Sequence, residues 1–186
     1  MTTLYVYPDT DPGQATRIED DAEIAARLAN AGIAFERWDA SRELPAGADQ
    51  ETILAAYADD VARLKRERGF TTADVVRLSP DHPQRAEFRE KFLDEHTHSE
   101  DEVRFFVEGS GLFCLHIGDE VLGLHAEAGD LIAVPAGTRH WFDMGPAPFF
   151  AAIRLFTNTE GWVAQFTGDG IARRFPMLDQ LPGPAS

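Results

Sequence analysis

The sequence predicts a mainly β protein whose C-terminal half forms an antiparallel barrel or sandwich. Between residues 92 and 156, short runs rich in β-branched and aromatic residues alternate with tight turns. Glycine, aspartate and proline mark the turns, and their even spacing is typical of all-β folds. The expected strands are residues 102–108, 112–117, 120–125, 131–134, 140–144 and 149–156, with turns at 109–111, 118–119, 129–130, 135–137 and 145–146.

The first third of the chain is expected to alternate strands and helices. Residues 3–7 alternate between polar and apolar side chains, which predicts a strand. Residues 20–31 carry Ile24 and Leu28 at helical spacing, so we expect a helix there. Residues 33–38 alternate again and predict a second strand.

The middle of the chain contains the longest helical pattern. Residues 51–68 predict one long helix, because their apolar side chains form a single stripe. The members of this stripe are Ile53, Leu54, Tyr57, Val61 and Leu64. Further along, we expect a strand at 73–78 and short helices at 84–92 and 162–166.

Length and composition indicate one domain over residues 1–186. Its barrel core is expected at about 73–157, after N-terminal elements in 1–72 and before a Pro-rich tail in 158–186.

The 32 acidic and 17 basic residues give a net charge of -15, which argues against binding nucleic acid or anionic membranes through bulk electrostatics. The single cysteine, Cys114, excludes an internal disulfide and is expected to be a buried apolar residue. No signal-like or membrane-length apolar run is present, so we expect a cytoplasmic protein.

Candidate metal ligands lie in residues 95–102 and at His140. On an extended strand, side chains two apart share a face, so His96, His98 and Glu102 are expected to point the same way. If the strand of His140 faces this one in a barrel, three imidazoles and one carboxylate converge. Such a donor set suits Fe(II), Ni(II), Co(II), Mn(II) or Zn(II), and an octahedral ion would keep two positions open for a chelating substrate. The alternative is that these histidines only fill the interior of the barrel.

The same residues resemble the two motifs of the cupin superfamily. The first motif, Gly-x5-His-x-His-x3-4-Glu-x6-Gly, is matched by its ligands and by its last glycine, whereas Glu90 occupies the leading glycine position. The second motif, Gly-x5-Pro-x-Gly-x2-His-x3-Asn, is matched up to His140, and Met144 replaces the final asparagine. Neither departure affects a ligand. The matched positions are His96, His98, Glu102 and Gly109 in the first motif, and Gly129, Pro135, Gly137 and His140 in the second.

Within the cupins, the chain resembles the acireductone dioxygenase family. The resemblance is carried by residues 91–105 and 139–145, and it extends to the strand at 4–7, to 154–156 and to Trp162. It implies a cupin-type antiparallel β-barrel (jelly-roll) with helices of the N-terminal third packed outside. It also implies an enzyme of methionine salvage that cleaves 1,2-dihydroxy-3-keto-5-methylthiopentene with O2, using one Fe(II) or Ni(II) per chain. The Fe(II) form of the family makes 4-methylthio-2-oxobutanoate and formate, and the Ni(II) form makes 3-methylthiopropanoate, formate and CO.

The resemblance also implies roles for residues beside the ligands. Arg104 lies on the same face as Glu102 and matches a residue associated with forming the substrate dianion, although an arginine in a structural ion pair is the alternative. Glu95 and Asp101 match residues linked to metal incorporation and to transmitting conformational change, yet on sequence alone they are equally well surface acids. The methylthioethyl tail requires an apolar pocket. Its candidate lining residues are Phe92, Phe105, Phe106, Phe142 and Trp162.

Two other functions stay open at this point. One is another metal-dependent cupin enzyme, either a different dioxygenase or a sugar-phosphate isomerase. An isomerase requires a phosphate-binding cluster, and only Arg104, Arg139 and Arg154 are candidates for it. The other is a non-catalytic metal-binding cupin.

The expected partners are a small enediol and O2, without nucleic acid or membrane. Bacterial members of the family are usually monomers, so the resemblance implies a monomer. Three further histidines are expected to be surface or hydrogen-bonded residues: His82, His116 and His125.

Overall fold

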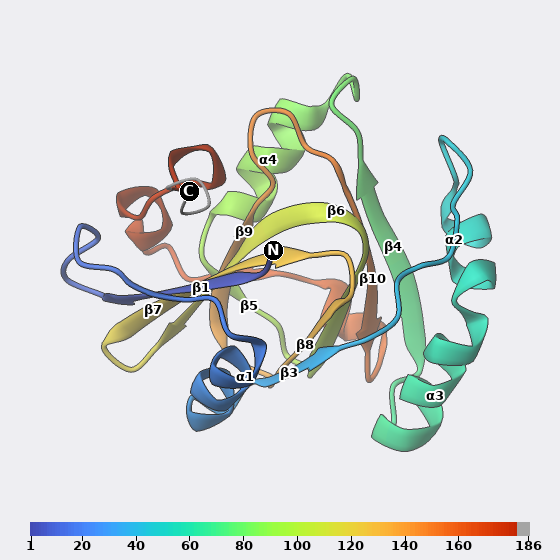
Figure 1. Ribbon diagram of the computed structural model, residues 1–186, viewed down its shortest axis with the longest axis horizontal. Coiled ribbons are helices and arrows are strands. Elements are labelled where there is room, and N and C mark those ends of the chain that lie inside the picture. The colour runs from blue at the N-terminus through green and yellow to red at the C-terminus, as the bar shows by residue number, and fades with distance from the viewer. Residues whose placement is uncertain (182–186) are drawn as a thin grey trace.

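The computed structural model describes residues 1–181, and two antiparallel sheets dominate it (Figure 1). The first sheet has the order β11-β5-β9-β6-β7-β1-β2, and the second has the order β4-β10-β6-β8-β3. β6 (Glu102–Ile117) belongs to both, because its first half pairs with β10 and β8 and its second half with β9 and β7. The expected mainly β, cupin-type fold is confirmed.

The turn predicted at residues 109–111 is wrong, since the two strands expected around it are one continuous β6. The chain bends there from one sheet into the other instead of reversing its direction. Gly109 has a φ of 63°, which favours glycine, and a Cβ at this position would lie 1.8 Å from the carbonyl oxygen of Phe149. Glycine therefore marks a bend between sheets, which local sequence does not distinguish from a hairpin turn.

The N-terminal third forms the predicted elements and extends both sheets. β1 (Thr3–Pro8) pairs with β7 (Glu120–Glu127) and with the short β2 (Thr16–Ile18). α1 (Asp21–Asn30) follows the side-chain cap of Asp20, which accepts from the backbone N–H of Glu23 at 2.9 Å. β3 (Ala34–Arg37) then pairs with β8 (Asp130–Val134) at the edge of the second sheet.

The single long helix predicted at residues 51–68 is two helices. α2 (Gln50–Ala56) ends and α3 (Ala58–Arg68) begins at Tyr57, where φ is -110° and ψ is 26°. The break allows the buried ring of Tyr57 to pack edge-on against Phe105, with ring centroids 5.5 Å apart. Tertiary packing thus interrupts a continuous apolar stripe, and both helices lie outside the second sheet beside β4 (Figure 1).

One further prediction, for residues 162–166, is wrong, and the other remaining elements are as expected or extend the sheets. The helix predicted at 162–166 is a 3₁₀ turn, Thr159–Trp162, followed by the short strand β11, and the last described residues of the predicted tail form two more 3₁₀ turns. The Pro-rich end of that tail, 182–186, lies outside the described residues. The other elements are β4 (Thr72–Leu78), α4 (Arg85–Leu93), β5 (His96–Thr97), β9 (Arg139–Asp143), β10 (Phe150–Phe156) and β11 (Gln165–Phe166).

Apolar side chains from both sheets fill the space between them. The ring of Phe113 and the side chains of Leu115 and Leu124 are fully buried there, together with Phe106 and Phe150. Cys114 is buried as expected, and burial raises the pKa of its thiol. The division into a single domain stays a prediction.

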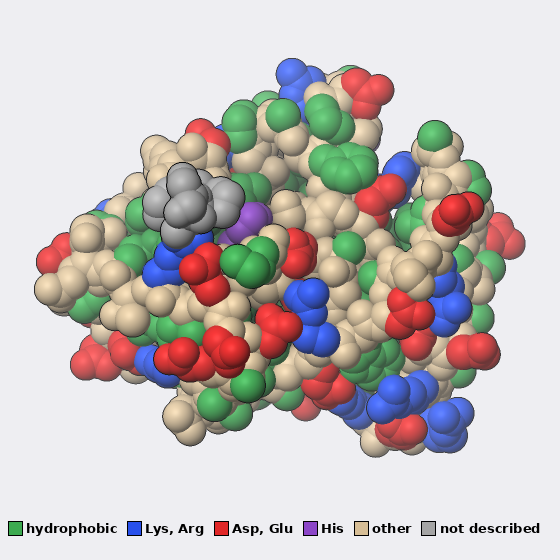
Figure 2. All heavy atoms as spheres, in the orientation of Figure 1, with side chains coloured by type: hydrophobic (Ala, Val, Ile, Leu, Met, Phe, Trp, Pro, Cys, Tyr) green, Lys and Arg blue, Asp and Glu red, His purple; other side chains and the backbone are tan. Residues whose placement is uncertain are grey.

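Charged side chains are mixed over the surface. Figure 2 shows acidic side chains interspersed with basic ones on one face of the protein. Ion pairs join surface charges of the protein, such as Arg42 with Asp60 at 3.0 Å and Arg63 with Glu67 at 3.1 Å. Among the helices of residues 1–181, none combines the length and the apolar character that crossing a bilayer requires.

Candidate metal centre

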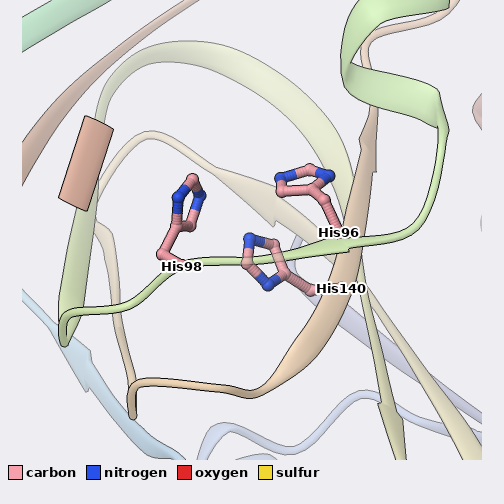
Figure 3. Close-up of side chains that lie close together, drawn as sticks. All are labelled: His96, His98 and His140. Atoms are coloured by element: carbon pink, nitrogen blue, oxygen red, sulfur yellow. The ribbon is translucent and has the colours of Figure 1, made fainter. Parts of the chain in front are cut away.

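The predicted ligands meet where β5, β9 and the start of β6 come together. His96 in β5 is paired directly opposite His140 in β9, so these strands are neighbours in one sheet and do not face each other across a barrel. His98 follows β5, and Glu102 is the first residue of β6. Figure 3 shows the imidazoles of His96, His98 and His140 turned toward one another, and their ligand nitrogens lie within 4.8 Å of one another.

The chain between His98 and Glu102 does not form the straight strand that alternation predicted. Residues 98–101 form an irregular bend, after which Glu102 enters the second sheet. The shared face expected from alternation is therefore not the reason that Glu102 meets the histidines. The bend brings its carboxylate across the gap between the sheets, where Oε2 lies 3.7 Å from His98 Nε2 and 3.6 Å from His140 Nε2.

Backbone carbonyl groups orient all three imidazoles. The Nδ1 of His96 lies 2.8 Å from the carbonyl oxygen of Asp94, and that of His140 lies 2.8 Å from Thr138. His98 uses a distant partner, the carbonyl oxygen of Val163 at 3.2 Å. A carbonyl oxygen only accepts, so each Nδ1 carries the proton and each Nε2 presents a lone pair. This is the usual way in which proteins prepare histidines for a metal ion.

Several of the converging atoms are buried without a protein partner. Within residues 1–181, the Nε2 atoms of His98 and His140 and the Oε2 atom of Glu102 have no hydrogen-bond partner. Burying unsatisfied polar atoms is costly, and three such acceptors at one point require an explanation. A divalent cation at their centre satisfies all of them, and imidazole with carboxylate is a suitable donor set for a first-row transition metal. The residues present thus fit a bound metal ion.

The electrostatics favour the forms that bind metal. Burial lowers the pKa of His140 to about 3, and it also lowers the pKa values of His96 and His98. Burial acts to raise the pKa of Glu102, but the charges of Arg104 and of the neighbouring histidines outweigh it and lower the pKa to about 2. Neutral imidazoles and an ionised carboxylate are therefore the stable forms at neutral pH.

Arg104 forms the structural ion pair that was the alternative for this residue, and its expected role toward the substrate dianion stays a prediction. Its Nη2 donates to Glu102 Oε1 at 2.8 Å, and its Nε donates to the same oxygen at 3.3 Å, so it does form a buried ion pair. This pairing leaves the other oxygen of Glu102 free to face the histidines. Arg104 also lines the cavity described next, where its guanidinium group is available to a bound anion.

A cavity of about 310 Å³ opens beside the imidazoles. Of the aromatic residues expected to line a substrate pocket, Phe92 and Trp162 line this cavity, whereas Phe105, Phe106 and Phe142 do not. Arg154 of β10, which is paired opposite Arg104 of β6, also faces the cavity and is held by Asp74 at 2.6 Å and 3.0 Å. The lining residues are Lys91, Phe92, His96, His98, Arg104, Arg154, Trp162, Val163, Ala164 and Phe166.

Three of the predicted aromatic lining residues pack elsewhere. Phe105 points away from the site, because it alternates with Arg104, and its ring packs against Tyr57 and Trp38. Phe106 is fully buried between the sheets. The ring of Phe142 lies beneath the guanidinium group of Arg104, 5.1 Å from its Cζ, and so supports the arginine without reaching the cavity.

Three further lining residues, Val163, Ala164 and Phe166, were not predicted. The exposed apolar side chains of Trp162, Val163 and Phe166 surround the mouth of the cavity. The β11–β5 pairing, with Phe166 opposite His96, brings this segment to the site. Only the family resemblance pointed to Trp162, and periodicity indicated none of the others. The register position of Arg154, once known, would have placed it beside Arg104.

The two acids beside the ligands differ in their surroundings. Glu95 is buried and accepts hydrogen bonds from Thr167 Oγ1 at 2.8 Å and from His116 Nδ1 at 2.7 Å, so it is not a surface acid. Asp101 is exposed and accepts from the backbone N–H of Ala136 at 2.8 Å, which joins the two motifs. Their expected roles in metal incorporation and conformational change stay predictions.

Comparison with known proteins gives one consistent result. A model of the "ARD/ARD' family" matches residues 3–164. The acireductone dioxygenase of Marinobacter nauticus is 61% identical to this chain over 186 residues. The alignment covers 100% of both chains. That of Pseudomonas paraeruginosa is 60% identical over 180 residues, which are 96% of this chain and 99% of the relative.

A solved structure shares the fold. It is described as acireductone dioxygenase from Bacillus anthracis with cadmium ion in active center, and it superposes with a TM-score of 0.78 at 32% sequence identity. The superposition covers 89% of this chain and 98% of the other.

Proposed function

This chain belongs to the ARD/ARD' family, and we propose that it acts as an acireductone dioxygenase. The proposed substrate is 1,2-dihydroxy-3-keto-5-methylthiopentene, which is cleaved with incorporation of both atoms of O2. The proposed metal ligands are His96, His98, Glu102 and His140. A metal ion bound by them supplies Lewis acidity toward a chelating enediol and, for a redox-active ion, access to one-electron chemistry.

One observation carries this proposal: three imidazole nitrogens and a carboxylate oxygen converge at the wall of a cavity that a buried arginine also lines. The four donors leave room for further ligands in an octahedral arrangement, which a bidentate substrate requires. A closed structural zinc site more often contains thiolates, and Cys114 is buried elsewhere in the fold.

The other cavity residues fit an anionic head with an apolar tail. Arg104 provides charge-assisted hydrogen bonds to an enediolate and favours its ionised form. Phe92 and Trp162, with Val163, form an apolar wall that suits a methylthioethyl tail and excludes water from it. At about 310 Å³, the cavity is at the small end of ligand sites, as expected for a substrate of this size.

We further propose one metal ion per chain, with the identity of the ion selecting the products. With Fe(II), the expected products are 4-methylthio-2-oxobutanoate and formate, which serve methionine salvage. With Ni(II), they are 3-methylthiopropanoate, formate and CO. A cytoplasmic monomer without nucleic-acid or membrane partners is the proposed form, and light scattering of the purified protein tests the monomer.

The alternative enzyme, a sugar-phosphate isomerase, is less well supported. It needs a cluster of cationic side chains around the phosphate. Of the three arginines that were candidates for such a cluster, Arg139 does not line the cavity. Arg104 and Arg154 do line it, and each also donates to a carboxylate, Arg104 to Glu102 and Arg154 to Asp74. A metal-binding cupin without turnover remains distinguishable by experiment.

The test is anaerobic reconstitution of metal-free protein with Fe(II), followed by addition of the enediol and O2. We expect stoichiometric consumption of O2 and enediol with release of formate. Reconstitution with Ni(II) should add CO to the products. Protein that retains one equivalent of metal and consumes no O2 with the enediol would refute the proposal in favour of a binding cupin.

A further inference from the structure

Phe113 contacts two functional groups of the metal centre without lining the cavity. Its ring is stacked on the imidazole of His140, with centroids 5.3 Å apart and planes inclined by 15°. The Cζ of Arg104 lies 4.8 Å from the centroid of the same ring. One apolar side chain thus touches both a proposed metal ligand and the residue proposed to stabilise the substrate anion.

The bend in β6 creates this arrangement. Arg104 lies in the half of β6 that belongs to the second sheet, and Phe113 lies in the half that belongs to the first. Because the strand bends at Gly109, the two side chains face each other between the sheets. On the other side, Phe113 is paired opposite Phe142 of β9, which makes His140 its diagonal neighbour, within reach of a large side chain.

The ring of Phe113 is held rigidly. It is fully buried in the core formed with Leu115, Leu122 and Leu124. Phe142 completes the support, since its ring lies 6.4 Å from Phe113 and 5.1 Å from the Cζ of Arg104. A Cβ at Gly111 would lie 2.3 Å from the Phe142 ring, so only glycine at this position leaves space for that ring.

We infer that Phe113 is a positioning residue that fixes His140 and Arg104 relative to each other. Its π face attracts the guanidinium group, and such contacts are stronger when the cation is buried, as Arg104 is. The same ring limits rotation of the His140 imidazole about its Nδ1 hydrogen bond to Thr138. The role of Phe113 in positioning Arg104 for the substrate anion rests on the proposed function. Its role in positioning His140 for the metal ion does not, because metal binding can be measured without turnover.

The test replaces the ring with an aliphatic side chain in Phe113→Leu. Metal-free protein is titrated with Co(II), whose visible absorption bands report ligand geometry, and the Co(II) protein is then titrated with oxalate as a chelating dianion. We expect altered Co(II) bands, a loss of Co(II) affinity on the order of 10-fold, and a loss of oxalate affinity of about 5- to 30-fold. In the Fe(II) protein, kcat/KM for the enediol should fall by at least as much as oxalate affinity.

The matched control is Phe106→Leu. Phe106 is also a fully buried phenylalanine of β6 in the same core, and its ring contacts Phe142 at 6.0 Å. Within the described chain it makes no ring contact with His140 or Arg104. It should lose similar stability and keep the Co(II) spectrum and the oxalate affinity. If Phe113→Leu does not fold, Phe113→Met preserves more of the volume and serves the same comparison.

The two proposals fail in different ways. Wild-type protein that binds Co(II) but, when loaded with Fe(II), consumes no O2 with the enediol refutes the proposed function and leaves the Co(II) and oxalate comparisons as the test of Phe113. Unchanged Co(II) bands and oxalate affinity in the Phe113 variant overturn the positioning role, and so do equal changes in the Phe106 control.

Discussion

Replacing Arg104 by leucine should separate its structural role from its role toward the substrate. Arg104 and Glu102 are both almost fully buried, and the guanidinium group donates twice to Glu102 Oε1. Removing one partner of a buried pair leaves an uncompensated charge, which destabilises a fold by about 3–5 kcal/mol. We therefore expect metal-free Arg104→Leu protein to lose that much of its free energy of unfolding.

Bound metal should restore much of this loss. The carboxylate of Glu102 faces the proposed metal position with Oε2, so a cation there replaces the missing positive charge. The Ni(II)-loaded variant is thus expected to approach wild-type stability and to retain metal, because ligand binding stabilises the native state in proportion to its affinity. Turnover should still fall roughly 100-fold or more, as when a charge-stabilising donor is removed from an active site.

Urea unfolding followed by circular dichroism, with and without Ni(II), measures both effects. Arg154→Leu is the matched control, since Arg154 also lines the cavity but pairs with Asp74 rather than with a proposed ligand. Its destabilisation should be smaller and should not depend on metal. Equal destabilisation of the Arg104 variant in the metal-free and metal-loaded states would refute this reasoning, and so would full turnover.

Three further predictions concern the ligands and the bend in β6. His96→Ala should abolish metal retention through gel filtration, as measured by elemental analysis, and a variant that still retains one equivalent contradicts the ligand set. Gly109→Ala should destabilise the fold by more than the roughly 1–3 kcal/mol of backbone strain alone, because its Cβ would meet the Phe149 carbonyl oxygen. The control is Gly47→Ala, measured in the same urea assay. Gly47 also has a positive φ, but its new Cβ would meet no atom of the described chain within 4 Å, so this variant measures the backbone strain alone. Metal-free protein should lose stability as the pH falls from about 6.5 toward 3, since the pKa of His140 is lowered to about 3 in the fold and the unfolded chain takes up the proton first. A free energy of unfolding that stays constant between neutral pH and pH 5 would contradict this last prediction.

Local patterns in the sequence determined most of the elements and the identity of the proposed ligands. Alternation and turn residues were sufficient for β1, β3, β4, β7, β8, β9 and β10, because side-chain direction along a strand repeats every two residues. The spacing of His96, His98, Glu102 and His140, together with the family resemblance, pointed to all four converging donors. These are short-range properties, which each segment carries independently of its neighbours.

Only the tertiary structure decided how those segments meet. Nothing in residues 102–117 indicated that Gly109 bends one strand between two sheets, since the same glycine could equally close a hairpin. The break at Tyr57 also depends on a distant ring, that of Phe105. The Val163 carbonyl that orients His98 and the contact of Phe113 with Arg104 likewise join residues far apart in the chain or across the fold. Such contacts follow from the packing of whole sheets against each other, and periodicity within a single segment carries no information about which surfaces will be brought together.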